Sequence, residues 1–151
     1  MRLEQILIEY SQENNLDHTL KIDQDNKCMM TVNEINTVVF ERALARNGYY
    51  IYAAIGRIPP EREAEIAILA LESNLFGLET GLSQLGYAKD QRLLVLFTYL
   101  EEENVDYENF KKVFKNFTDH LLHWNEKFAS ILKAETAHIP QSNDKKNILF
   151  A

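Results

Sequence analysis

Cysteine, glycine and proline are scarce in this sequence, and long apolar runs are absent. The 151 residues include 1 cysteine, 5 glycines and 3 prolines. The single cysteine, Cys28, excludes a disulfide framework and a thiolate metal cluster, and it fits a protein of the reducing cytosol. The longest apolar runs, such as residues 93–97, are far shorter than the ~20 residues that a membrane-spanning helix needs. We therefore expect a cytoplasmic protein without stable membrane insertion.

Basic residues are also few, 16 against 23 acidic residues, and the net charge is −7. This balance argues against nucleic-acid binding, because phosphates repel an acidic surface. Glu4 and Glu9 interrupt the first apolar residues and no small-residue cleavage site follows, so we expect no secretory signal. The sequence does contain 46% apolar and 26% charged residues, as an ordinary globular protein does. We expect one domain over residues 1–134 and a flexible tail over residues 135–151, with an apolar stretch at 148–150.

The first part of the sequence predicts a helix followed by strands. Residues 1–14 have apolar side chains at the spacing of one helical face: Leu3, Ile6, Leu7 and Tyr10. Apolar and polar residues then alternate over residues 20–22 and 28–32 around a polar turn, which predicts a hairpin of two short strands. Two further strands are expected over residues 35–44 and 49–55, and the second of them ends before two prolines.

A central helix is expected over about residues 60–76, and it is apolar on more than one side. One stripe comprises Ala64, Ala67, Ile68, Leu71 and Leu75, and another comprises Ile66, Leu69 and Ala70. The surface helix of a monomer needs only one such stripe. We therefore expect the helix to pack on its own sheet and on a second copy in a twofold dimer, the alternative being a second layer of the same chain. The candidate dimer interface comprises Ile66, Leu69, Ala70, Leu75 and Phe76.

Residues 82–88 and 92–100 predict another pair of strands, and residues 106–134 predict a long final helix. That helix repeats large apolar residues at alternating steps of four and three: Phe110, Phe114, Phe117, Leu121, Trp124, Phe128 and Ile131. Side chains this bulky do not suit a coiled-coil seam, so we expect them to pack on the sheet. The order of elements predicts an α+β fold, a twisted and mainly antiparallel β-sheet flanked by three helices.

Few residues offer catalytic or metal-binding chemistry. His120 and His123 lie three apart on the final helix and could supply half of a metal site, but a partly buried structural role is favoured. Cys28 lies among alternating apolar residues, where a small buried hydrophobe is expected and a nucleophile is the alternative. The glycines of residues 77–86 lack the Gly-Lys-Ser/Thr ending of a phosphate loop. We expect no enzyme activity, no metal and no cofactor.

One ordered set of motifs is more distinctive than these. A predicted strand ends in Gly56-Arg57-Ile58-Pro59, and the next helix ends in Leu71-Glu72-Ser73-Asn74-Leu75-Phe76. After it come Glu79-Thr80-Gly81, Leu85-Gly86-Tyr87 and the strand Leu93-Leu94-Val95-Leu96. In order and spacing, residues 1–133 resemble the type III secretion effector chaperones of the Tir-chaperone (CesT-like) family. Leu82 departs from the pattern, because many relatives have a second glycine there.

The resemblance implies a homodimeric chaperone of the bacterial cytoplasm, with the central helix at or near the interface. It implies as partner the N-terminal segment of a secreted effector, held extended, kept secretion-competent and delivered to the secretion ATPase. Such a segment can add to a sheet edge and fill apolar grooves. We expect the groove on the first helix and strands, at Leu3, Ile6, Leu7, Leu20, Ile22, Met30 and Val32. The alternative is that these side chains are the inner faces of their elements.

Two other functions stay open at this point. A dimer of the same fold could sequester a regulatory protein and couple secretion to gene expression, as some relatives do, and only the identity of the partner separates this role from the first. A small hydrolase or metal enzyme could use Cys28 or the pair His120 and His123. No complete constellation of nucleophile, base and oxyanion site supports that hypothesis.

Overall fold

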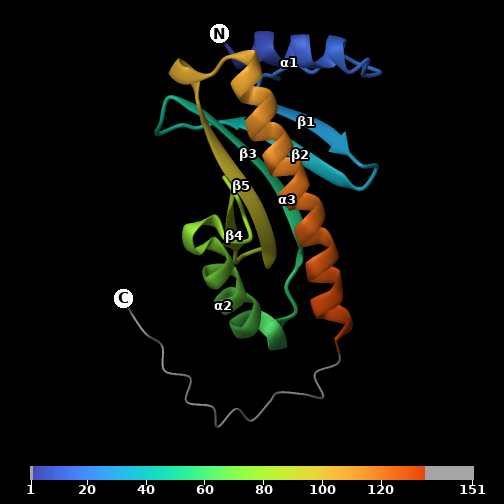
Figure 1. Ribbon diagram of the computed structural model, residues 1–151, viewed down its shortest axis with the longest axis vertical. Coiled ribbons are helices and arrows are strands. Elements are labelled where there is room, and N and C mark those ends of the chain that lie inside the picture. Colours follow the sequence, from blue (N-terminus) through green and yellow to red (C-terminus); the bar gives the residue numbers. More distant parts are fainter. Residues whose placement is uncertain (1, 135–151) are drawn as a thin grey trace.

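The computed structural model describes residues 2–134 as helices packed on a five-stranded sheet (Figure 1). The helices and strands are, in chain order, α1 (Leu3–Glu13), β1 (Lys27–Val32), β2 (Asn36–Arg42), β3 (Gly48–Arg57), α2 (Glu63–Asn74), β4 (Gln84–Ala88), β5 (Leu93–Glu101) and α3 (Tyr107–Lys133). The strand order is β1-β2-β3-β5-β4, and each neighbouring pair is antiparallel. The predicted α+β fold is confirmed. The tail expected at residues 135–151, with its apolar stretch, lies outside the described residues.

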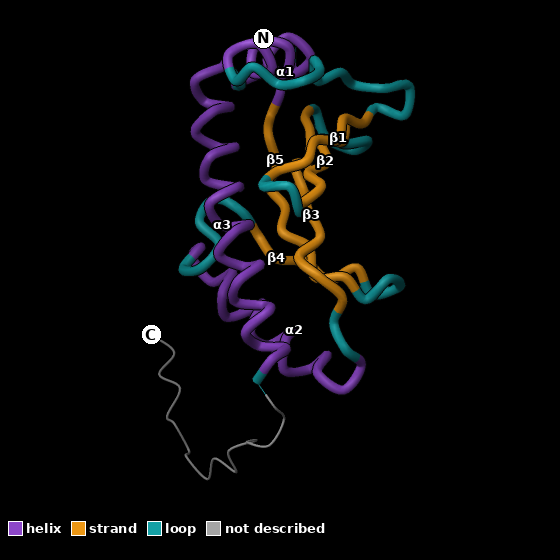
Figure 2. The backbone as a smooth tube through the Cα atoms, turned by 90° about the vertical axis from the view of Figure 1, so that its right-hand side faces the viewer, coloured by secondary structure: helices purple, strands orange, loops and turns teal. Residues whose placement is uncertain are grey.

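The core lies between the sheet and α3. Buried and partly exposed side chains alternate along β5, because successive side chains of a strand point to opposite faces. Figure 2 shows α3 along one face of the sheet. In the same view α1 lies near one end of α3, and α2 lies near the other end. The predicted aromatic seam is buried against this face at Phe110, Phe114, Phe117, Leu121, Trp124 and Phe128. The expectation that the final helix packs on the sheet is therefore confirmed.

The Gly56-Arg57-Ile58-Pro59 motif joins β3 to α2 and lets α3 come close. The β3–β5 register shifts between Ala54 and Gly56. A Cβ atom on Gly56 would lie 2.5 Å from a ring carbon of Phe128, so only glycine leaves room for that ring. After the strand, Pro60 occupies the first turn of a short 3-10 helix (Pro60–Arg62) that leads into α2.

The strand predicted around residues 20–22 is wrong. Residues 19–23 have no regular secondary structure, and β1 forms its hairpin with β2 instead. The backbone N–H of Leu20 donates to Ser11 Oγ at 2.8 Å, and that hydroxyl donates to the Leu7 carbonyl at 2.7 Å. Leu20 is thus tied to α1 rather than to a neighbouring strand. The other predicted helices and strands are confirmed to within a few residues.

Candidate functional site

The inner face of α1 is closed by the core. Leu3, Ile6 and Leu7 are fully buried, with 0% exposed surface. On the same helix, the Tyr10 ring packs edge-on against Phe110 and Phe114 of α3, with ring centroids 5.7 and 5.4 Å apart. The three predicted groove residues of α1 therefore face inward and offer no surface to a ligand in this fold.

Two hollows lie beside β1. One, of about 290 Å³, is here called the strand hollow, and the residues that line it are Leu16, Asp17, His18, Leu20, Met29, Met30, Thr31 and Thr37. The other, of about 370 Å³, is called the helix hollow, and it is lined by Tyr10, Met30, Thr31, Val32, Asn33, Phe114, Thr118, Asp119 and Leu122. Because Met30 and Thr31 line both, the two hollows are neighbours along one strand.

The structure brings part of the predicted groove together at these hollows. Leu20, Met30 and Val32 line one or both, while Ile22 packs against the core outside them. Sequence reasoning missed Met29, which is 63% exposed, and Leu122, which is 41% exposed. Leu122 could have been found, because it is a large apolar residue that lies off the seam of α3.

β1 is an edge strand whose outer side is free beyond Lys27, where Asp23 bonds both backbone groups of Lys27. It pairs only with β2 in the sheet. Within residues 2–134, the backbone of Met29, Met30 and Thr31 makes no hydrogen bond beyond those of that ladder. An open edge of this kind presents unpaired N–H and C=O groups to an added strand. The hollows lie at the same strand, so both backbone and apolar side-chain recognition are available there.

The opposite edge of the sheet is covered at its centre. The side chain of Asn74, the last residue of α2, accepts a hydrogen bond from the Leu85 N–H at 2.7 Å and donates to the Leu85 carbonyl at 2.9 Å. Its amide thus satisfies the β4 backbone as a neighbouring strand would. The two edges of the sheet therefore differ, and β1 is the one open to a partner.

One charged residue, Asp119, lies in the wall of the helix hollow, and it pairs with Lys115 at 2.7 Å on the exposed side of α3. Burial raises the pKa of the Tyr10 hydroxyl on the same wall. Outside the hollow, the Tyr107 hydroxyl donates to the Glu13 carboxylate, and burial together with this carboxylate raises the pKa of Tyr107. The hollow thus combines apolar and aromatic lining with a single ion pair.

A second apolar surface lies on the outer side of α2 and the loop after it. We call it the α2 face, and its exposed members are Ile68, Leu71, Leu75, Phe76, Leu78 and Leu82. Of the candidate interface residues, Leu75 and Phe76 belong to it, and Phe76 is 91% exposed. Leu69 and Ala70 are partly buried against the core. Ile66 is only 1% exposed, so its placement on the outward stripe is wrong.

The two apolar stripes of α2 differ in exposure, and the candidate interface drew residues from both. Ile66 and Ser73, seven residues apart, are the buried positions of the helix. Ile68, Leu71 and Leu75 follow the spacing of the opposite face and are exposed. Both stripes are apolar, and apolar periodicity alone does not say which one meets the sheet.

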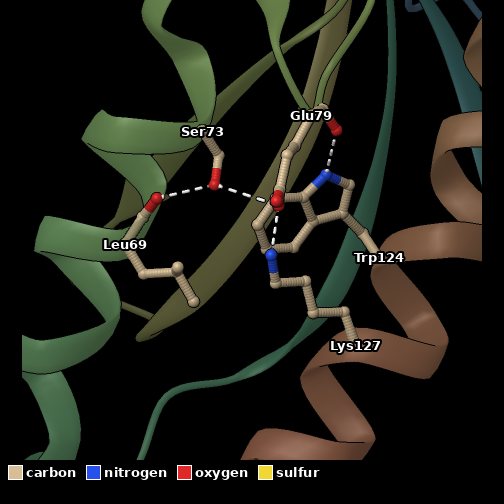
Figure 3. Close-up of polar contacts among 5 residues, drawn as sticks. All are labelled: Leu69, Ser73, Glu79, Trp124 and Lys127. Carbon is tan, nitrogen blue, oxygen red and sulfur yellow. Dashed lines mark hydrogen bonds and ion pairs between the residues drawn. The ribbon is translucent and has the colours of Figure 1, made fainter.

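A polar network anchors the loop that carries part of the α2 face (Figure 3). The Glu79 carboxylate pairs with Lys127 of α3, and Ser73 Oγ lies 3.5 Å from it and donates to the Leu69 carbonyl at 2.7 Å. The Trp124 ring nitrogen donates to the Glu79 carbonyl at 2.8 Å. The Lys127 ammonium lowers the pKa of the Glu79 carboxyl. The loop is therefore held between α2 and α3 and presents its apolar side chains outward.

His120, His123 and Cys28 each make contacts of a structural kind. In the part of the chain that the structure describes, no three His, Cys, Asp or Glu side chains could hold a metal ion together. His120 Nδ1 lies 2.7 Å from the Asn116 carbonyl, and His123 packs edge-on against Trp124. Cys28 is buried, and burial raises the pKa of its thiol. No described helix has the length and apolar character to cross a membrane.

Comparison with known families decides the class of protein. The profile of the Tir chaperone protein (CesT) family matches residues 5–125, a span that contains α2 and all five strands. The chain belongs to this family. A protein of Chlamydia pneumoniae is 24% identical over 119 residues, which cover 78% of this chain and 91% of that protein. The resemblance inferred from the Gly-Arg-Ile-Pro and Asn-Leu-Phe motifs is confirmed.

Solved structures share the fold of this chain. A chain of the HopA1–SchA chaperone–effector complex superimposes with a TM-score of 0.66 at 15% identity, covering 82% of this chain and 93% of that one. A chain of the ExsC–ExsE complex gives 0.66 at 17% identity, with 83% and 96% covered. A chain of the ExoU–SpcU complex from the Pseudomonas aeruginosa type III secretion system gives 0.62 at 15% identity, with 88% and 99% covered. The fold is therefore shared over nearly the whole length of these chains.

Proposed function

We propose that this protein is a type III secretion chaperone of the bacterial cytoplasm that binds the N-terminal segment of a secreted effector. In this role it holds the segment in extended form, keeps it secretion-competent and helps to deliver it to the secretion apparatus, including its ATPase. Membership of the CesT family supports the chaperone class. The observation that carries the proposal is the free edge of β1 between the strand hollow and the helix hollow.

The physical basis of binding is strand addition combined with apolar anchoring. An extended segment laid along β1 would pair with the outward backbone groups of Met29 and Thr31, since those of Met30 face β2. Because alternate side chains of a strand point to opposite faces, its apolar residues would enter hollows that lie beside that strand. Ordering such a segment costs conformational entropy, so both contributions are needed for a stable complex.

The same proposal includes a homodimer built on the α2 face. An exposed apolar surface of this kind, carried by a helix and an anchored loop, fits an interface between copies. In a twofold dimer the same patch on each copy meets its mate, so one apolar surface per chain is enough. The anchoring of the loop by Glu79 and Trp124 supports this, because a rigid surface loses little entropy on association.

The regulatory alternative uses the same surfaces and differs only in the partner. Membership of the Tir chaperone protein (CesT) family supports the effector chaperone, which is therefore the conclusion. The partner is expected to be an N-terminal segment without stable structure of its own.

A co-purification experiment tests this function. N-terminal segments of about 100 residues from the secreted proteins of the same bacterium are expressed with the full chain, and retained segments are measured by titration. We expect Met29→Asp to weaken a retained segment at least tenfold, because a carboxylate would have to be desolvated in the strand hollow. Leu44→Asp is the matched control, since Leu44 is 99% exposed and lines neither hollow.

Hydrogen exchange on the same complex tests the mode of binding. The amides of Met29 to Thr31 that face outward are expected to exchange more slowly when a segment is bound, because strand addition pairs them. Failure of every segment to be retained would overturn the proposed function. Retention without added protection at β1, and without an effect of Met29→Asp, would place the binding surface elsewhere.

A further inference from the structure

An apolar stripe leads along the outside of α3 toward the helix hollow. The residues at steps of four and three along this side are Thr118, Leu122, Asn125, Ala129 and Leu132. Such spacing places side chains on one side of a helix. Leu122, Ala129 and Leu132 are all exposed, and Leu122 also lines the hollow. The stripe therefore connects the last turn of α3 with the hollow beside β1.

The end of α3 is a fixed starting point for the chain that follows. Arg62, which is 8% exposed, donates from Nη1 to the Ile131 carbonyl, and its guanidinium pairs with Glu65 at 2.8 Å. This contact holds the last turn of α3 against the start of α2. Ala134, the last described residue, therefore has a defined position beside the start of α2.

The following segment is long enough to return to the hollow. Leu122 lies eleven positions before Lys133, the last residue of α3. At 1.5 Å per residue, this separation is about 17 Å along the helix. Ile148 lies fourteen positions after Ala134, and a chain of that length can span up to about 46 Å. The distance to the helix hollow is well within this reach, with slack left for a turn.

The composition of the segment matches the hollow. Lys145 and Lys146 stand just before Ile148, Leu149 and Phe150. The hollow offers aromatic and aliphatic walls from Tyr10, Met30, Val32, Phe114 and Leu122. Three consecutive apolar residues suit such a pocket. Asp119 on the wall already pairs with Lys115, so the two lysines would share this carboxylate with it.

We propose that residues 148–150 bind in the helix hollow of their own chain and compete with the effector segment for it. This inference rests on the proposed function, because it regulates the same surface. A tethered segment is present at an effective concentration near the millimolar range, so even a weak contact keeps the hollow occupied. An effector segment that also pairs along β1 forms backbone hydrogen bonds in addition to its contacts in the hollow. It therefore displaces residues 148–150 from the hollow.

The test uses a fluorescent peptide of residues 141–151 and the full-length chain. The acceptor is a variant with Ile148→Ser, Leu149→Ser and Phe150→Ser, in which the proposed occupant no longer competes for the hollow. We expect the peptide to bind this triple variant at least tenfold more tightly than the parent chain, measured by fluorescence anisotropy. A peptide with the same three serines is expected not to bind.

Two further substitutions in the triple variant locate the contact. Leu122→Asp is expected to weaken peptide binding at least tenfold, whereas Leu44→Asp, outside both hollows and the α2 face, leaves it unchanged. Both side chains are exposed, so both variants should keep the parent circular dichroism spectrum and unfolding midpoint. Equal affinity for parent and triple variant, no binding to either, or loss of binding with Leu44→Asp alone would each overturn the inference.

This experiment separates the inference from the proposed function because it contains no effector. Peptide binding at Leu122 together with failure to retain any effector segment would leave the intrachain contact standing and remove the chaperone role. Retained effector segments together with equal peptide affinity for parent and triple variant would remove only the intrachain contact.

Discussion

At the scale of single residues, Gly56 and Gly81 show why small residues occur in the motifs that identify the family. A Cβ on Gly56 would strike the Phe128 ring, and one on Gly81 would lie 2.4 Å from the His120 ring. Gly81 also has a positive φ of 60°. Both glycines therefore let α3 pack closely on a strand or a loop, which is a packing role that the sequence motif alone does not reveal.

Gly56→Ala is expected to lower the free energy of unfolding by about 1 to 3 kcal/mol, because Phe128 is buried and cannot move away freely. Chemical unfolding in urea measures this. Gly86→Ala is the matched control, since its Cβ would lie at 3.1 Å from the Phe97 ring and needs a smaller adjustment. Adding Phe128→Leu to Gly56→Ala should recover part of the loss. Equal costs for the two glycines would contradict the close-packing explanation.

Glu79 gives a prediction about pH. Lys127 lowers the pKa of this carboxyl below its usual 4.5, so the ion pair stabilises the folded state above that pH and loses its effect as the pH falls through the folded-state pKa. Glu79→Gln is expected to lower the free energy of unfolding at pH 7 by at most about 1 kcal/mol, because the pair is partly exposed. The difference from the parent should shrink toward pH 3. Urea unfolding at several pH values measures it.

Glu126→Gln is the control for this experiment, because within residues 2–134 Glu126 makes no ion pair. It should change stability little at any pH. A Glu79→Gln effect that is constant from pH 7 to pH 3 would mean that the carboxylate charge is not what anchors the loop.

At the scale of elements, α2 separates what a sequence can predict from what it cannot. The presence of two apolar stripes could be predicted from the sequence, because the apolar residues outnumber those that one face needs. Which stripe is buried could not be predicted, since Ile66 and Leu71 are equally apolar and only the position of the sheet decides which is buried. The false strand around Leu20 has a similar cause. A short alternation cannot distinguish a strand from a loop that a single hydroxyl, Ser11 Oγ, ties to α1.

The α2 face gives the test of the dimer. Light scattering after gel filtration is expected to give twice the 17.6 kDa of one chain for the parent protein. Leu71→Asp should shift the mass toward one chain, because a carboxylate would be desolvated within an apolar interface. Ile35→Asp is the control, since Ile35 is 85% exposed and lies in the turn between β1 and β2. An unchanged dimer of Leu71→Asp would show that copies meet through another surface.

At the scale of the whole molecule, the fold was more predictable than the site. Helix and strand order follow from periodicity and from glycine and proline positions, which are local properties. The binding surface depends on which apolar residues remain after the core is filled, and that is settled by packing. Leu3, Ile6 and Leu7 carry the same pattern as a binding helix, yet α3 and the sheet bury them completely. Met29 and Leu122 stay exposed because the packing of the core leaves them uncovered.

The unpaired edge of β1 also sets a limit on how the protein is produced. A bare strand edge can template aggregation between identical molecules. β1 is only six residues long, begins at Lys27 and is followed by Asn33 and Glu34 with positive φ, which shortens the flat stretch available for such pairing. A bound client segment would cover the rest of this edge, so we expect production together with a client to protect the strand from such pairing.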